Sequence, residues 1–171
     1  YTGSVQFAFK PHPSLFTELC KHPDWGIERT REFYRQWAEM PNTQLETGEY
    51  TDLFKTSDAM IHNCGSFACE YLYVDKPVLF TARDRESTIA PLNRLGRECI
   101  DAHYFATNPD EIEAFITEVV IGGNDTLSSR RESLMDSQTF KVGNGSQNAS
   151  EAVYKDILAS LRWPPLDTAT Q

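Results

Sequence analysis

The chain has 171 residues, a formal net charge of -9 at pH 7, 40% hydrophobic residues and 12% aromatic residues. This length fits one domain or one half of a two-domain protein, and the apolar fraction supplies a core, which excludes a disordered chain. The acidity argues against a nucleic-acid partner, which requires a basic face, and against polybasic attachment to a membrane. No apolar run approaches the ~20 residues of a membrane span.

The first third of the chain is predicted to alternate strands and helices. Residues 5–9 (VQFAF) form a β-rich run that ends at Lys10-Pro11-His12-Pro13. The two prolines hold His12 on a stiff backbone at the carboxyl end of that strand, and Ser14 is a predicted N-cap. The elements predicted next are helices over 15–21 and 27–40, a strand over 43–47 and a short helix over 50–55.

The stretch 56–80 has the pattern of a strand, a glycine turn, a helix and a second strand. The apolar run 59–61 stops at His62-Asn63-Cys64-Gly65-Ser66, residues 67–74 suit a helix, and residues 78–80 form another buried strand. In open α/β sheets, ligands bind outside the carboxyl ends of strands and against a helix N-terminus. The pattern therefore predicts a βαβ unit with a ligand site at its turn.

The rest of the chain is predicted to hold one polar segment, one strand and three helices. Residues 81–100 are expected to be polar and irregular, and residues 103–106 to form a last short strand. A helix begins at Asn108, and two more are predicted over 127–140 and 149–161. Because helices separate the strands, we expect an α/β fold, a Rossmann-like three-layer αβα domain with a mostly parallel sheet.

The cysteines and the sequons give opposing signals about the compartment. The four cysteines, which have no C-x-x-C spacing, are Cys20, Cys64, Cys69 and Cys99. We expect reduced thiols in a cytoplasmic protein, although three N-x-S/T sequons would matter if the chain were secreted. The four histidines share no metal-ligand spacing, so no metal is expected.

Two histidines are candidates for chemistry. His12, at a strand end between two prolines, is placed to donate to a phosphate or to act as an acid or base; the alternative is an exposed turn histidine. His62 either packs in the core or lines a pocket together with Asn63 and Cys64. Nucleophilic catalysis by a Ser-His or Cys-His pair is not expected, because the G-x-S-x-G elbow is missing.

The residues after the turn suit a nucleotide diphosphate. Gly65 permits close backbone approach, and Ser66 and Phe67 offer a hydroxyl and backbone N–H groups to an anion. Glu70 lies one helical turn beyond Ser66, where a carboxylate would meet ribose hydroxyls. The alternatives are a simple N-cap serine and a solvent-facing glutamate.

Three blocks of sequence resemble a known family. They are Lys10-Pro11-His12-Pro13, the run SDAMI at 57–61, and DKPVLF at 75–80. They are similar to the K/R-x-H-P, S-D-x-x-I-T-D-Y-S-S-x-x-x-D and x-K-P-I-I-F motifs of the CDP-glycerol glycerophosphotransferases, which are teichoic-acid and capsule polymerases of the GT-B type. A looser match to D-G-x-A-S-E lies at 144–151, so the resemblance covers most of the chain. His62-Asn63-Cys64-Gly65 departs from the usual T-D-Y-S.

The resemblance implies a fold, an activity and a set of roles. Residues 1–171 would be one donor-nucleotide-binding domain, the C-terminal part of a larger two-domain transferase that uses no cofactor. Lys10 and His12 would contact donor phosphates, with His12 needed for transfer; Ser66 would hold the diphosphate and Glu70 would meet the ribose. Asp84 matches a family aspartate without an assigned role, and the tyrosine that follows it in the family is missing.

The expected partners follow from the same resemblance. They are a CDP- or UDP-activated donor, a glycan or polyol-phosphate acceptor, and an N-terminal GT-B domain that supplies the general base. We expect a cytoplasmic location, with any contact to the inner face of the membrane made through other parts, and no turnover by this segment alone. The alternatives are a nucleotide-sugar 2-epimerase-like half and a non-catalytic α/β binding module.

Overall fold

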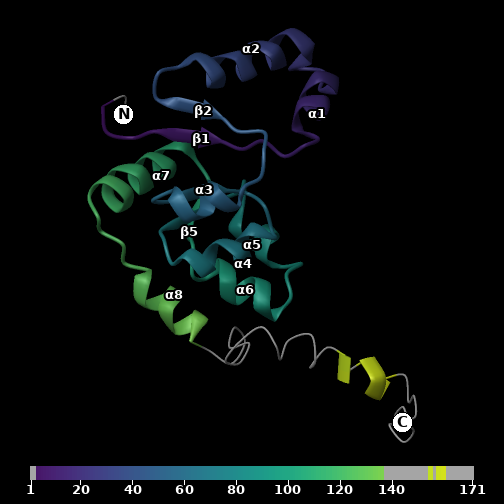
Figure 1. The fold of residues 1–171 in the computed structure, drawn as a ribbon, viewed down its shortest axis with the longest axis vertical. Coiled ribbons are helices and arrows are strands. Elements are labelled where there is room, and N and C mark those ends of the chain that lie inside the picture. The colour runs from purple at the N-terminus through teal and green to yellow at the C-terminus, as the bar shows by residue number, and fades with distance from the viewer. Residues whose placement is uncertain (1–2, 137–153, 156, 161–171) are drawn as a thin grey trace, which may run out of the picture.

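The computed structural model describes residues 3–136, 154–155 and 157–160, and the chain folds with α/β architecture (Figure 1). Its strands are β1 (Phe7–Phe9), β2 (Thr43–Leu45), β3 (Met60–His62), β4 (Val78–Thr81) and β5 (Tyr104–Ala106). β1 pairs with β2, and β3, β4 and β5 form a second sheet in that order; every pairing is parallel. The α/β class and the parallel pairing were predicted from the sequence, and both are compatible with a Rossmann-like layout.

Helices connect the strands. They are α1 (Leu15–Lys21), α2 (Gly26–Glu39), α3 (Thr51–Thr56), α4 (Phe67–Glu70), the 3-10 helix η1 (Tyr71–Val74), α5 (Arg85–Ile89), α6 (Arg94–Ile100), α7 (Pro109–Ala114), the π-helix η2 (Phe115–Ile121) and α8 (Ser128–Met135). In the predicted helix over 149–161, residues 154–155 and 157–160 are helical, and the rest lies outside the described residues. The resemblance block at 144–151 lies outside them entirely.

The core forms around β4, because successive side chains of a strand point to opposite faces. Val78 and Phe80 pack with apolar side chains of α4, η1 and α6, a cluster that includes Leu72 and Ile100. Leu79 packs on the other face with Ala106 and with the buried side chains of η2. Val5 and Phe7 join this second cluster, which places the N-terminal strand against the larger sheet.

The N-terminal elements pack mainly through aromatic rings. Phe9 of β1 stacks on Trp37 of α2 with ring centroids 4.8 Å apart, and it meets Phe33 edge-on at 5.5 Å. Offset and edge-to-face contacts of this kind are the arrangements that aromatic pairs prefer. In Figure 1, α1 and α2 lie beyond β1 and β2, on the side away from α8.

One expectation was wrong: the segment 81–100 is not irregular but contains α5 and α6. Asp84 caps α5 by accepting a hydrogen bond from the Ser87 N–H at 2.6 Å. Asn93 caps α6 in the same way, from the Gly96 N–H at 2.8 Å. Each cap satisfies a donor that a helix start leaves unpaired, which stabilises short helices of polar composition.

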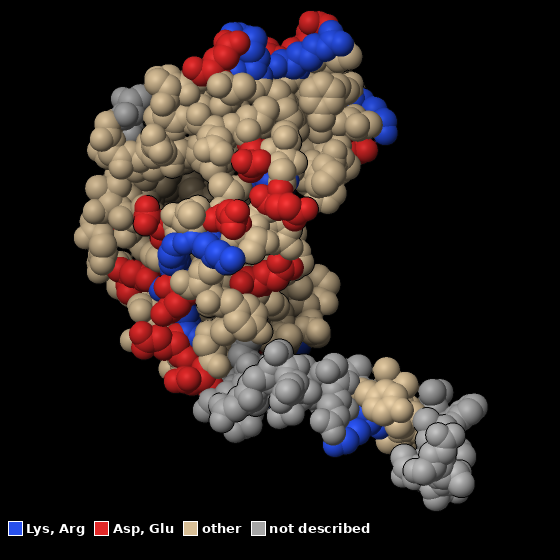
Figure 2. Space-filling model, in the orientation of Figure 1, with Lys and Arg blue, Asp and Glu red and all other residues tan. Residues whose placement is uncertain are grey.

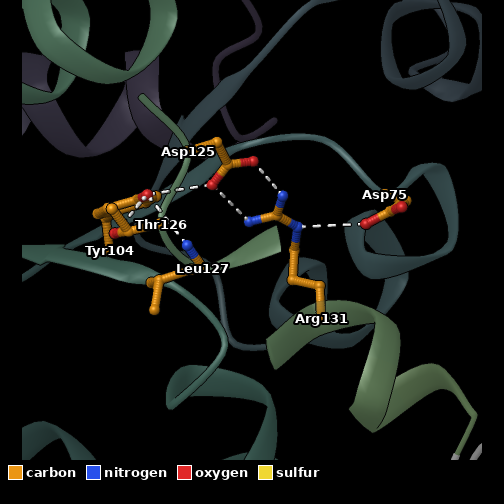
Figure 3. A network of polar contacts seen from close by, with 6 residues as sticks. All are labelled: Asp75, Tyr104, Asp125, Thr126, Leu127 and Arg131. Atoms are coloured by element: carbon orange, nitrogen blue, oxygen red, sulfur yellow. Dashed lines mark hydrogen bonds and ion pairs between the residues drawn. The ribbon is translucent and has the colours of Figure 1, made fainter. Parts of the chain in front are cut away.

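The buried Arg131 of α8 forms ion pairs with residues outside this helix (Figure 3). Arg131 is 1% exposed, and its guanidinium donates to both carboxylate oxygens of Asp125, one of them at 3.2 Å. Its Nε lies 3.4 Å from Asp75, which ends η1 in the left-handed region with φ of 48°. Tyr104 of β5 donates to Asp125 at 3.0 Å, so the network joins three parts of the chain.

Candidate functional site

The turn for which the sequence predicts a ligand site follows the carboxyl end of β3. The strand ends at His62, the turn residues run from Asn63 to Ser66, and α4 begins at Phe67. Ser66 holds the N-cap position, yet its side chain makes no capping hydrogen bond. Its exposed Oγ lies 3.2 Å from Sγ of Cys64, so the hydroxyl stays at the surface of the turn.

Hydrogen-bond donors converge on the Cys64 sulfur. Burial raises the pKa of this thiol, but hydrogen bonds from the Ser66 hydroxyl and from the backbone N–H groups of Phe67 and Ser66 lower it, and the net pKa lies below the ordinary value. These are the backbone donors that the sequence assigned to an anion. A turn that stabilises a thiolate has the donors that a phosphate oxygen also requires.

Gly65 is not required by the protein's own packing. A Cβ built on Gly65 meets nothing within 4 Å, and its φ is not in the left-handed region. Gly26, by contrast, has a φ of +73°, a backbone conformation that residues other than glycine rarely adopt. The space above the Gly65 backbone is therefore open to a ligand.

Glu70 has a partner that the sequence did not indicate. The hydroxyl of Tyr50 donates to Oε2 of Glu70 at 2.9 Å, and this hydrogen bond is the main reason that the pKa of Tyr50 is raised. The Tyr50 ring lies 5.0 Å from both Phe54 and Phe67. Tyr50 and Glu70 are 20 positions apart in the sequence, so no local pattern could reveal the pair.

His12 and Lys10 follow β1, as predicted. Ser14 begins α1 at the N-cap position but does not cap it, because its side chain turns to His12. Nδ1 of His12 accepts the Ser14 backbone N–H at 3.2 Å and lies 2.8 Å from the Ser14 hydroxyl. A backbone N–H can only donate, so Nδ1 is the acceptor, and the exposed Nε2–H is placed to donate a hydrogen bond to an oxyanion.

The structure brings some of the candidate residues together and keeps others apart. Gly65, Ser66, Phe67 and Glu70 occupy one turn and the four-residue helix α4 that follows it. In the described part of the chain, no hydrogen bond or ring contact joins His12 to that turn. Asp84 faces its own helix as a cap, which lowers the pKa of its carboxyl through the Ser87 N–H. Asn63 is exposed.

His62 is a buried, neutral side chain. It is 8% exposed, and its ring lies 5.1 Å from Phe80 and 5.3 Å from His103. Burial, with a smaller contribution from His103, lowers the pKa of His62 to about 3. Burial likewise lowers the pKa of His103 to about 4. Neither imidazole carries a charge at neutral pH, which removes His62 as a general acid at that pH.

Acidic side chains are prominent on the face shown in Figure 2, in keeping with the net charge. Across residues 3–136 and the short described stretches near the C-terminus, no three His, Cys, Asp or Glu side chains gather as a metal site would require. In the same residues, no helix is both long and apolar enough to cross a membrane.

Comparison with known proteins returned no relative. No protein-family profile, no curated protein and no solved structure matches this chain.

Proposed function

We propose that this chain is the donor-nucleotide-binding domain of a GT-B transferase that resembles the CDP-glycerol glycerophosphotransferases of bacterial surface-polysaccharide synthesis. Its three-layer αβα core would be one half of the GT-B fold. The observation that carries the proposal is the parallel β3–turn–α4–β4 unit. After the end of β3 come Gly65, whose Cβ position is empty, Ser66, whose hydroxyl does not cap α4, and the exposed Glu70. A diphosphate and its ribose present the groups that such a series binds.

Each residue has a defined role in this proposal. The Ser66 hydroxyl and the N–H groups of Ser66 and Phe67 hold the diphosphate, while Glu70 accepts from the ribose hydroxyls. His12 donates a hydrogen bond from Nε2–H to a phosphate oxygen, and the positive charge of Lys10 attracts the same phosphate. Negative charge develops on the departing nucleotide, so donors aimed at it lower the barrier. A glycan or polyol-phosphate acceptor and the general base would come with the other half of the protein.

Calorimetric titration of this chain with CDP and with UDP tests the proposal. We expect sub-millimolar binding of one of them, about tenfold weaker in Ser66→Ala and in Glu70→Ala, since each loses a hydrogen bond to the ligand. Ser133→Ala and Glu132→Ala remove the same side chains from the exposed face of α8 and serve as matched controls.

The outcomes separate the alternatives. Preference for CDP supports a CDP-activated donor, whereas preference for UDP supports a UDP-sugar transferase or a 2-epimerase-like half. Absence of binding by either nucleotide, to folded protein, contradicts the proposal and leaves a non-catalytic α/β module.

A further inference from the structure

Two cysteines that the proposed site does not use lie side by side in the core. Cys69 belongs to α4 and Cys99 to α6, and their Sγ atoms are 3.2 Å apart. The two helices pack against the same apolar cluster, which includes Ala68 and Ile100. A disulfide has an S–S bond of about 2.05 Å, so a shift of about 1 Å would bring these sulfur atoms to bonding distance.

The pair is asymmetric in its access to solvent. Cys99 is fully buried, whereas Cys69 is partly exposed. An external reagent therefore meets Cys69 first, and Cys99 lies behind it within reach of the same sulfur. This is the arrangement of an attacking thiol and a resolving thiol in disulfide exchange.

We propose that Cys69 and Cys99 form a reversible intramolecular disulfide, which joins α4 to α6 when the protein meets a small disulfide oxidant such as glutathione disulfide. The inference rests on the position of the two sulfur atoms and does not depend on the proposed function.

The exchange balances in two steps. The Cys69 thiolate attacks one sulfur of glutathione disulfide, forms a mixed disulfide and releases one glutathione thiolate. The Cys99 sulfur then loses its proton to solvent, attacks Sγ of Cys69 and expels the second glutathione thiolate. The protein gives up two electrons and two protons, and one glutathione disulfide becomes two glutathione molecules.

The second step is expected to be slow. Burial, with further contributions from the hydrogen bond to Cys69 and from its charge, raises the pKa of the Cys99 thiol, so little of it is ionised at neutral pH. The reaction is therefore followed to equilibrium rather than judged from its initial rate.

A Cys69–Cys99 disulfide would also affect the turn at residues 63–66, because Cys69 is hydrogen-bonded to it. The Cys69 N–H donates to the Ser66 carbonyl at 3.1 Å, and Glu70 is the next residue. A covalent link at Cys69 would fix the first turn of α4 relative to α6. Oxidation would thereby restrict the segment that carries the candidate ligand residues.

The experiment incubates the folded full chain with glutathione disulfide, blocks free thiols with iodoacetamide under denaturing conditions, and maps the peptides by mass spectrometry. We expect a peptide pair linked through Cys69 and Cys99, lighter by about 2 Da than its reduced components, which dithiothreitol separates. Cys20 is expected to be alkylated. Cys64, whose pKa is lowered, is expected to carry glutathione or iodoacetamide without joining the link.

Two variants serve as controls. Cys64→Ser is expected to form the same link, and Cys69→Ser, a change at a partly exposed site, is expected to abolish it while Cys99 remains a free thiol. Circular dichroism verifies that both variants are folded. Alkylation of both Cys69 and Cys99 in oxidised wild type, a stable mixed disulfide at Cys69, or a link to another cysteine would each overturn the proposal.

Discussion

The fold itself does not require a glycine at position 65. Its backbone conformation is ordinary and its Cβ position is empty, so an alanine fits without displacing any atom. A requirement for glycine here would have to come from something outside the chain that approaches the backbone closely.

We therefore expect Gly65→Ala to keep the stability of the wild type while weakening nucleotide binding by about tenfold, because the added methyl group blocks close approach of the diphosphate. Thermal unfolding and calorimetry measure the two effects. Gly26→Ala is the contrasting variant: its positive φ makes the methyl group destabilising by about 1 kcal/mol. Unchanged affinity in folded Gly65→Ala would show that no ligand approaches the backbone at this position.

The two buried histidines predict how stability depends on pH. Their pKa values in the folded protein, about 3 for His62 and about 4 for His103, lie below the ordinary value of 6.5. The unfolded chain therefore binds more protons between pH 6.5 and pH 4, and the free energy of unfolding falls as the pH falls through this window.

His62→Phe is expected to reduce that slope by up to about 1.4 kcal/mol per pH unit, because one proton-binding group of the unfolded state is lost. A phenyl ring at this position still packs against Phe80. Urea unfolding at a series of pH values gives the slope, and the exposed His22→Ala variant is expected to keep it. An unaltered slope in His62→Phe would mean that His62 is protonated in the folded state.

Among the elements, α8 is held by a buried ion pair as well as by apolar packing of Leu134. Arg131 and Leu134 are its buried residues. The Arg131 side chain is 1% exposed, and that of its partner Asp125 is 18% exposed. Removing one member of such a pair leaves a charge in a site that water hardly reaches.

We expect Arg131→Met to lower the free energy of unfolding by about 3 kcal/mol, because Asp125 loses its counter-charge and two hydrogen bonds. Denaturation in urea at neutral pH is the measurement. Arg130→Met changes a neighbouring, exposed arginine of the same helix and is expected to cost less than about 0.5 kcal/mol. Equal losses in the free energy of unfolding for the two variants would show that the Arg131–Asp125 ion pair does not stabilise the fold.

The accuracy of the sequence-based prediction also varied by element. β1, β3 and β4 followed from apolar runs. The start of α7 followed from Asn108, whose side chain accepts from the Glu111 N–H. The helices α5 and α6 were missed because their polar composition outweighed the capping residues Asp84 and Asn93. Tyr50 and Arg131 meet their partners only after folding, so local patterns contain no signal for those contacts.

At the scale of the whole molecule, burial is unevenly distributed. The fully buried apolar residues begin at Ala68 and cluster around β3, β4 and β5. In the described residues before position 50, only Thr30 is buried. The aromatic contacts between β1 and α2 are therefore partly open to solvent.

Hydrogen exchange followed by mass spectrometry is expected to reflect this difference. Peptides that contain β4 should exchange slowest, because both faces of that strand are covered and it pairs with a neighbour on each side. Peptides that contain β1 should exchange sooner, through local opening. Equal protection of the two strands would contradict an uneven distribution of stability.

The order of the larger sheet also bears on how quickly the chain reaches its fold. β3 pairs with β4 and β4 with β5, so each strand meets the next one along the chain. The paired residues are 18 positions apart in β3 and β4 (Met60 and Val78) and 25 apart in β4 and β5 (Leu79 and Tyr104), whereas Phe7 of β1 and its partner Thr43 are 36 apart. Contacts between segments close in sequence cost less loop-closure entropy, and chains rich in them fold faster. The β3–β5 unit is accordingly suited to nucleate folding, with the N-terminal strands docking afterwards onto a surface already formed.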